Sequence, residues 1–216
     1  MSAGPELDEL LAAHAAGRLP PALGLIVAAH LALAPASRRR YRTYEALGGA
    51  FLAELAPAPL ASDAWERICR RLDDEDQEPA PATLPAAGDC RRLPAPLRAL
   101  VPDRLERLPW HRIGAAVQAE LAADAAGYRT TLIRVPAGLP YPRHRHRGRE
   151  LILVLEGGFR DGAACHRRGD LVIAGPEAHH APVALPEQDW LWLRVLDAPL
   201  RRTGPLGPVL DRLRRL

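Results

Sequence analysis

The stretch of sequence that decides the fold is HRHRGRELILVLEGG, residues 144–158. His144, His146 and Glu150 have the same parity, and residues of one parity in a β-strand point to the same face. Imidazole nitrogens and carboxylate oxygens are ordinary ligands for divalent transition metals. The pattern therefore predicts a metal site built on one strand and on the segment that leads into it.

Two glycines bracket this stretch at the spacing of cupin motif one. Gly138 precedes His144 by five intervening residues, and Gly157 follows Glu150 by six. Between them lies an apolar strand, Leu151 to Leu155. The stretch resembles cupin motif one in full, and the resemblance implies a small double-sheet β-barrel. The alternative, a solvated basic loop, would not explain why these offsets all match.

Cupin motif two is matched in spacing and poorly in identity. Gly169 leads to His180 at the motif's offset. The motif's proline, second glycine and asparagine are replaced by Gly175, Glu177 and Ala184. His180 is preferred over its neighbour His179 because adjacent strand residues face opposite sides. The predicted ligands are thus His144, His146, Glu150 and His180. Their types suit Zn(II), Fe(II), Mn(II) or Ni(II) and do not choose among these metals.

Composition and charge exclude several classes of protein. The hydrophobic content of 48% is ample for real cores, and the net charge of +3 lacks the excess of a dedicated nucleic-acid binder. The first residues show no signal-peptide pattern, and the longest apolar run, Leu23 to Ala36, is too short for a membrane span. Three widely separated cysteines, Cys69, Cys90 and Cys165, argue against a disulfide framework. We expect a soluble protein of the reducing cytoplasm.

The first part of the chain has helical periodicity. Apolar spacing, caps and prolines predict four helices. They cover Glu6 to Gly17, a segment that starts after Pro20-Pro21 and runs to Leu33, a segment that begins near a Ser37 N-cap, and Asp63 to Leu72. Gly17 is the expected C′ residue of the first helix. Residues 77–98 are rich in proline and alanine, which predicts a semi-rigid linker.

Beyond the linker, short apolar segments punctuated by glycine and proline predict strands. They cover residues 114–117, 128–135, 151–159, 170–173 and 190–195. We therefore expect an α+β protein of two domains. Residues 1–76 would form a small helical bundle of about four helices, and residues 99–216 an all-β cupin barrel, the double-stranded β-helix.

This order of parts resembles one family, the ChrR-like zinc anti-sigma factors. The stretches that carry the likeness are LDELLAAHAAGRLPPALGLIVAAHLAL, EALGGAFL, WHRIGAAVQ, RHRHRGRELILVLEGGFRD, GDLVIA, HAPVA and DAPLRRTGPLG. The resemblance implies a helical domain that sequesters an extracytoplasmic-function sigma factor in the cytoplasm. It also implies a cupin domain tied to the response to oxidants, with Zn(II) on the four ligands named above.

The helical domain departs from the family pattern in one respect. The family binds a further zinc there through a histidine near the N-terminus, followed by His, three residues, Cys, two residues and Cys. His30 matches the second ligand, whereas Pro5, Ala34 and Ser37 stand at the other positions. Because none of these replaces a thiolate or an imidazole well, we predict that this zinc is absent. His30 would then be a packed histidine, and sigma binding would depend on exposed apolar helix surfaces.

Two alternatives stay open on the sequence alone. A metal-dependent cupin enzyme of dioxygenase or isomerase type would require an open coordination position and a residue such as Tyr128, His166 or His179 beside the metal. Direct binding to nucleic acid rests only on short arginine runs and is disfavoured. Cys165 is either an oxidant-sensitive thiol or a structural cysteine. The sequence does not specify which sigma factor is bound or the oligomeric state.

Overall fold

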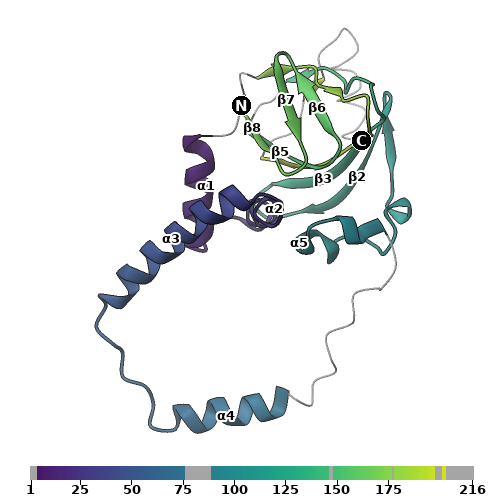
Figure 1. Cartoon of the computed structure of the whole chain (residues 1–216). Helices are drawn as coiled ribbons and strands as arrows, with labels where there is room; N and C mark the ends of the chain where they lie inside the picture. The colour runs from purple at the N-terminus through teal and green to yellow at the C-terminus, as the bar shows by residue number, and fades with distance from the viewer. Residues whose placement is uncertain (1–3, 76–88, 146–147, 177, 198–200, 203–216) are drawn as a thin grey trace.

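The computed structural model describes residues 4–75, 89–145, 148–176, 178–197 and 201–202. A group of helices precedes a β-barrel, and most of these helices lie against one side of it (Figure 1). The helices are α1 (Pro5–Ala15), α2 (Pro21–Leu33), α3 (Pro35–Ala53), α4 (Ala64–Glu75) and α5 (Ala95–Arg98), with 3-10 turns η1 (Asp89–Arg92) and η2 (Leu105–Arg107).

The barrel is made of antiparallel strands in three sheets. The strands are β1 (His111–Ile113), β2 (Ala116–Ala123), β3 (Arg129–Val135), β4 (His144–Arg145), β5 (Glu150–Glu156), β6 (Gly158–Asp161), β7 (Ala164–Arg167), β8 (Leu171–Ala174), β9 (His179–His180), β10 (Val183–Ala184), β11 (Trp190–Leu196) and β12 (Arg201–Arg202). A six-stranded sheet has the order β1-β2-β3-β11-β5-β8, and the smaller sheets have the orders β10-β6-β7 and β12-β4-β9. The predicted α+β architecture is confirmed.

The six-stranded sheet is buried on both faces. Along β5, Leu151, Leu153 and Leu155 belong to a core shared with the helices. The alternate residues Ile152 and Val154 belong to a second core inside the barrel. Because side chains alternate across a strand, a strand covered on both sides reads as a continuous apolar run. The run ELILVLE therefore reflects two separate cores on opposite faces of one strand.

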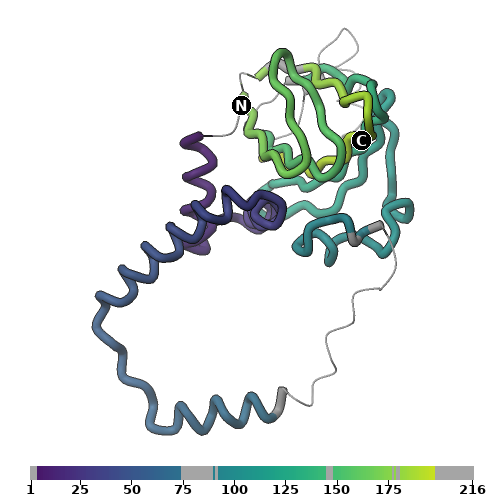
Figure 2. Tube along the Cα trace, viewed as in Figure 1, coloured from purple at the N-terminus to yellow at the C-terminus, as the bar shows by residue number. Residues whose placement is uncertain are grey.

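Helix α2 is the central element of the outer core. It is apolar on nearly every side, as expected for a helix enclosed by other elements. Its buried residues are Ala22, Leu23, Ile26, Val27, Ala29, His30 and Leu31. Figure 2 shows that α5, which comes much later in the sequence, lies on the same side of the barrel as α1 and α2. The backbone N–H of Ala22 donates to Asp124 Oδ2 of the β2–β3 turn at 3.4 Å, so the barrel provides an acceptor at the start of α2.

Helix α1 ends as the sequence predicts. Gly17 has a φ of +64° directly after the C-cap Ala16. The N–H of Gly17 donates to the His14 carbonyl at 3.0 Å, and the N–H of Arg18 donates to the Ala13 carbonyl at 2.9 Å. These two bonds form a Schellman motif, which requires the left-handed conformation that glycine adopts without strain.

The predicted role of Ser37 as the N-cap of the third helix is wrong. Helix α3 begins at Pro35, with Ala34 as its N-cap, and no side chain caps it. Proline suits the first helical position because its φ is already helical and its missing N–H has no partner there to lose. Ser37 lies inside the first turn, where its hydroxyl bonds to His30.

The C-terminal part of the expected linker, residues 89–98, is folded onto the barrel. Leu93 and Leu97 are 1% and 0% exposed, respectively. The Arg168 guanidinium holds this segment from the barrel side by donating to the Arg92 carbonyl at 3.0 Å. Helices and barrel therefore share one core, whereas the domain limits at residues 76 and 98 stay a prediction.

The apolar stretch 151–159, predicted as one strand, forms two strands that turn at Gly157. Gly157 has a φ of +62°, and a Cβ atom there would lie 2.3 Å from the Asp189 carbonyl oxygen. Only glycine fits, because any side chain would meet rigid backbone. The turn sends β6 out of the six-stranded sheet to pair with β7 and β10.

The shared core makes a prediction about cooperativity. Ile26 on α2 is fully buried, so Ile26→Ala should lower the free energy of unfolding by about 2–5 kcal/mol. Helix content by circular dichroism and barrel packing by fluorescence of Trp190 and Trp192 should be lost in one transition, shifted together. Leu60→Ala, at a residue 83% exposed, is the control and should leave the transition unchanged. Separate transitions for the two signals would contradict a shared core.

Candidate functional site

The backbone brings the predicted metal ligands to one end of the barrel. In the β4–β9 ladder His144 lies directly opposite His180, and β5 begins at Glu150. Residues directly opposite each other in an antiparallel ladder share a face of the sheet. His146 lies outside the described residues, as does the side chain of His180. The structure thus places the side chains of His144 and Glu150 and the backbone of His180.

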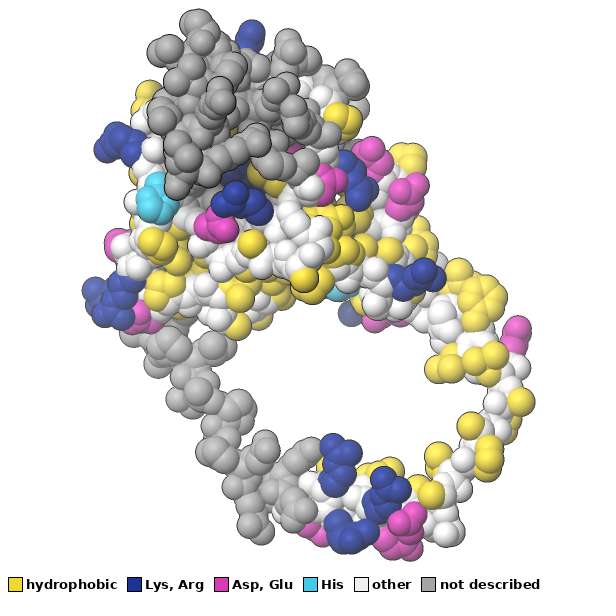
Figure 3. Space-filling view, turned by 180° about the vertical axis from the view of Figure 1, so that it is seen from behind, with side chains coloured by type: hydrophobic (Ala, Val, Ile, Leu, Met, Phe, Trp, Pro, Cys, Tyr) yellow, Lys and Arg dark blue, Asp and Glu magenta, His cyan; other side chains and the backbone are white. Residues whose placement is uncertain are grey.

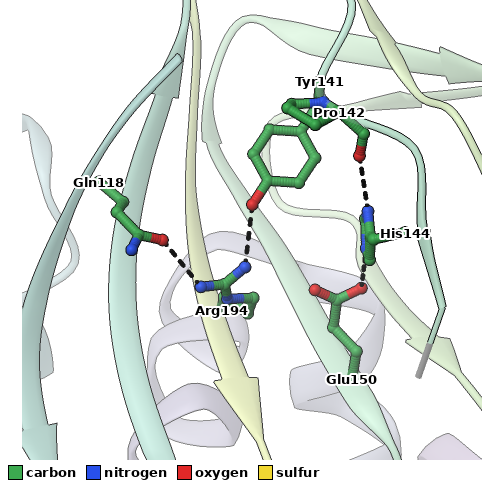
Figure 4. Close-up of polar contacts among 6 residues, drawn as sticks. All are labelled: Gln118, Tyr141, Pro142, His144, Glu150 and Arg194. Carbon is green, nitrogen blue, oxygen red and sulfur yellow. Dashed lines mark hydrogen bonds and ion pairs between the residues drawn. The ribbon is translucent and has the colours of Figure 1, made fainter. Parts of the chain in front are cut away.

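His144 and Glu150 form a buried pair, 4% and 0% exposed (Figure 4). His144 Nδ1 lies 2.9 Å from the Pro142 carbonyl, which can only accept, so Nδ1 carries a proton. The ring's other nitrogen, Nε2, lies 3.5 Å from Glu150 Oε2. In a neutral ring this places a lone pair against a carboxylate oxygen, an arrangement that needs a proton or a cation between the two atoms. A divalent metal ion bound to both atoms fits it.

The complete ligand set lies partly outside what the structure describes. Among the described side chains, no group of three or more His, Cys, Asp or Glu residues is close enough to hold a metal ion. Since two of the four predicted side chains are not among them, the set of His144, His146, Glu150 and His180 stays a prediction.

A polar network beside this pair was missed by the sequence analysis. Arg194 on β11 donates from Nη1 to the Tyr141 hydroxyl at 3.0 Å and from Nη2 to Gln118 Oε1 at 3.1 Å (Figure 4). The Tyr141 ring meets the His144 ring edge-on, with centroids 5.3 Å apart. One sequence signal could have revealed this network. The apolar strand WLWLRVL contains a single arginine, which points to the same side of the strand as its two tryptophans.

A second feature is a row of exposed apolar side chains that extends from α3 to α4. We call it the apolar arm. Its members are Leu47, Phe51, Leu52, Leu55, Leu60, Trp65, Ile68 and Leu72. Figure 3 shows hydrophobic side chains along this part of the chain, and Figure 1 shows α4 set apart from the barrel. Exposed apolar surface of this extent on neighbouring elements marks an interaction site in soluble proteins.

Comparison with known proteins identifies the family. Residues 101–198 match the family described as the ChrR Cupin-like domain. The chain is 39% identical over 194 residues to the anti-sigma-E factor ChrR of Cereibacter sphaeroides, which covers 90% of this chain and 89% of the relative. The chain belongs to the ChrR family of anti-sigma factors. The crystal structure of Rhodobacter sphaeroides SigE in complex with the anti-sigma ChrR matches with a TM-score of 0.75 and 36% identity, covering 88% of this chain and 96% of that chain.

Membership in the ChrR family makes this chain a regulatory protein and not an enzyme, as predicted. Of the residues considered for catalysis, Tyr128 packs on the helix side of the sheet. His166 stacks on Phe159 with ring centroids 4.7 Å apart, and burial lowers the pKa of its imidazole. The side chain of His179 lies outside the described residues.

His30, the one residue that matches the family's zinc pattern in the helices, is held by hydrogen bonds. Its Nδ1–H donates to the Gly169 carbonyl of the barrel at 2.8 Å. Its Nε2 lies 2.8 Å from the Ser37 hydroxyl, which can donate to it. His30 is 4% exposed, and burial lowers its pKa. The residue therefore joins α2, the start of α3 and the turn before β8.

The cysteines of the chain form no disulfide bond with one another. Cys69, Cys90 and Cys165 are free thiols; Cys90 is buried and Cys165 is exposed on β7.

Within the described ranges, no helix combines the length and apolarity that crossing a membrane requires.

The burial of His30 predicts a dependence of stability on pH. Its folded-state pKa lies below the unfolded value of about 6.5, so the unfolded chain binds the proton more readily. The contribution of His30 to stability is present above that value and is lost as the pH falls from it towards the lowered pKa. Urea unfolding from pH 8 downwards should show this loss.

The His30→Ala variant and an exposed control separate this effect from other histidines, since burial lowers the pKa of His14 and His166 in the same direction. His30→Ala should unfold about 2–4 kcal/mol more easily at pH 8, because it removes two buried hydrogen bonds. It should also lose less stability than the native protein on acidification. His111→Ala, at an exposed position on β1, should follow the native curve. Parallel curves for native and His30→Ala would refute the assignment.

Proposed function

We propose that this chain is a cytoplasmic anti-sigma factor that sequesters an extracytoplasmic-function sigma factor and releases it under oxidative stress sensed through the cupin domain. The observation that carries the proposal is the apolar arm, which the described parts of the chain leave uncovered. The likeness to a chain crystallised with SigE supports the choice of partner.

The geometry of the arm suits a partner that has an apolar groove. On α4, Trp65, Ile68 and Leu72 recur at helical spacing and form one face, while arginines and acidic residues occupy the rest. Burying a large apolar side chain contributes about 1.5–3 kcal/mol, so several such residues would sustain a stable complex. An amphipathic helix laid in an apolar groove is a common mode of recognition. The complex would therefore form by burial of apolar surface and would not require zinc in the helices.

We further propose that the cupin binds one divalent metal ion, Zn(II), through His144, His146, Glu150 and His180. The buried His144–Glu150 pair, whose Nε2 and Oε2 atoms lie 3.5 Å apart, supports the proposal. When bound, the ion supplies a cross-link among β4, β5 and β9. Fe(II), Mn(II) and Ni(II) accept the same ligand types.

The apolar arm yields a prediction for sigma binding. Trp65→Ala, at a residue 71% exposed in the free chain, should weaken binding of the sigma factor by at least about 2 kcal/mol, or roughly thirtyfold in Kd. The stability of the free chain should stay unchanged, because the side chain packs on little. Calorimetric titration of the full chain with the purified sigma factor measures both Kd and stoichiometry.

Leu100→Ala is the matched control, since Leu100 is exposed and lies outside the arm. The full chain is the right reagent, because the helices share their core with the barrel. Sigma binding that survives Trp65→Ala together with Phe51→Ala at full strength would refute the arm as the contact surface. A chelator should leave binding in place.

The metal proposal yields a separate prediction. Native protein should contain about one metal ion per chain by atomic emission, and His144→Ala and Glu150→Gln should each lose most of it. His111→Ala, an exposed histidine on β1, should keep it. Both ligand variants should still bind the sigma factor and should fail to release it under oxidant. Full metal content in either ligand variant would remove that residue from the site.

A further inference from the structure

A buried arginine, Arg194, lies in the barrel, and no salt bridge joins it to a carboxylate of the described residues. Trp190, Trp192 and Arg194 alternate along β11, so the guanidinium lies on the inward face with the two indoles. It sits over the Trp192 ring, 5.8 Å from the ring centroid. Arg194 is 5% exposed. A guanidinium stays charged at any physiological pH, so the barrel contains a permanent positive charge.

The hydrogen-bond partners of this charge are neutral. Its hydrogen bonds run to the Tyr141 hydroxyl and the Gln118 amide oxygen, at 3.0 and 3.1 Å. No carboxylate among the described residues forms an ion pair with Arg194. Buried charges are ordinarily paired, because burying an uncompensated charge costs several kcal/mol. The described side chains thus solvate the guanidinium only in part.

The barrel core contains further buried hydrogen-bond donors. Nε of Arg194 and the indole nitrogens of Trp190 and Trp192 are buried without a hydrogen-bond partner in the described chain. The Tyr141 hydroxyl accepts from Arg194, which leaves its own proton to donate elsewhere. Buried donors without acceptors are rare and call for a bound group. Positive charge together with several donors selects an oxygen anion.

We propose that the barrel interior beside Arg194 binds a small oxyanion of the carboxylate type. Arg194 provides the charge, and Tyr141 and an indole N–H supply further donors; a planar guanidinium suits a planar carboxylate. The site adjoins the candidate metal centre through the edge-on contact of Tyr141 with His144, 5.3 Å between centroids. The inference rests neither on sigma binding nor on the identity of the metal.

Formate is the probe, added to exhaustively dialysed full-length protein, with chloride at equal ionic strength as the reference. Tryptophan fluorescence should change saturably, because Trp192 packs against the guanidinium. The thermal midpoint should rise with formate concentration, since a ligand that binds only the folded state stabilises it. A native protein that responds to formate no more than to chloride overturns the proposal.

Arg194→Gln should weaken formate binding about tenfold or more, because it removes the charge and retains a polar side chain. Arg134→Gln is the matched control: Arg134 lies on the neighbouring strand β3, on the outer face, with its guanidinium 5.9 Å from the Trp110 ring centroid. It should bind formate as the native protein does. Native affinity in Arg194→Gln overturns the proposal. If that variant does not fold, Tyr141→Phe, which removes one donor, should still weaken binding several-fold, and unchanged affinity overturns it.

Removal of the metal by chelation distinguishes the guanidinium from the metal as the anchor. Formate binding that persists in stripped protein, and that still depends on Arg194, supports the arginine site. Binding that disappears on stripping shows that the anion is a metal ligand, and the proposal is then wrong.

Discussion

The packing of α2 against the six-stranded sheet is the contact on which the rest of the structure depends. The sheet has a face of leucines on the side away from the barrel interior, and in the described part of the chain helices cover that face. Without helices, these side chains would face water at a cost of about 25 cal/mol per Å². Helix α2 covers them, and it is anchored near both ends, by Asp124 at Ala22 and by Gly169 at His30. The helical part is therefore a layer of the barrel, and only α4 and the end of α3 extend beyond it.

This packing would let the helices hold together without zinc, as the sequence predicts. A zinc ion would cross-link α2 to the start of α3. Here the His30–Ser37 hydrogen bond joins the same two segments, and Arg38 adds bonds to the Leu31 and Ala32 carbonyls at the end of α2. Individually such bonds contribute about 1 kcal/mol, far less than a structural metal ion. Burial of α2 against the sheet supplies the remainder.

Much of the fold followed from the sequence because the signals were local. Helical spacing and prolines located α1 to α4 within a few residues, and Gly17 ended α1 as predicted. The two-residue strands β4 and β9 were missed as strands, since so short a segment has no periodicity, yet the metal-ligand spacing pointed to them. Ser37 was wrongly predicted to be an N-cap, because a serine near the start of a helix is typical of that position. The sequence does not show that its hydroxyl bonds to His30 instead.

Other features escaped prediction because they depend on long-range contacts. Residues 89–98 look like a linker by composition, and their burial depends on the core that α2 and the sheet share. The polar network around Arg194 was not predicted, because it is formed with Tyr141 and Gln118, each more than fifty residues away in sequence. Local patterns determine which elements form, whereas the sheet determines which residues they meet.

The candidate site and the apolar arm are joined by a contiguous set of contacts. Glu150 on β5 lies opposite Ala174 on β8, and the turn before β8 contains Gly169. Gly169 bonds to His30, and His30 bonds to Ser37 in the first turn of α3, the helix whose far end begins the arm. Contiguity is necessary and not sufficient for coupling, which also requires an element with two arrangements that both sites bias. The His30 junction is suited to that role, because two hydrogen bonds hold it and can exchange partners at little cost in energy.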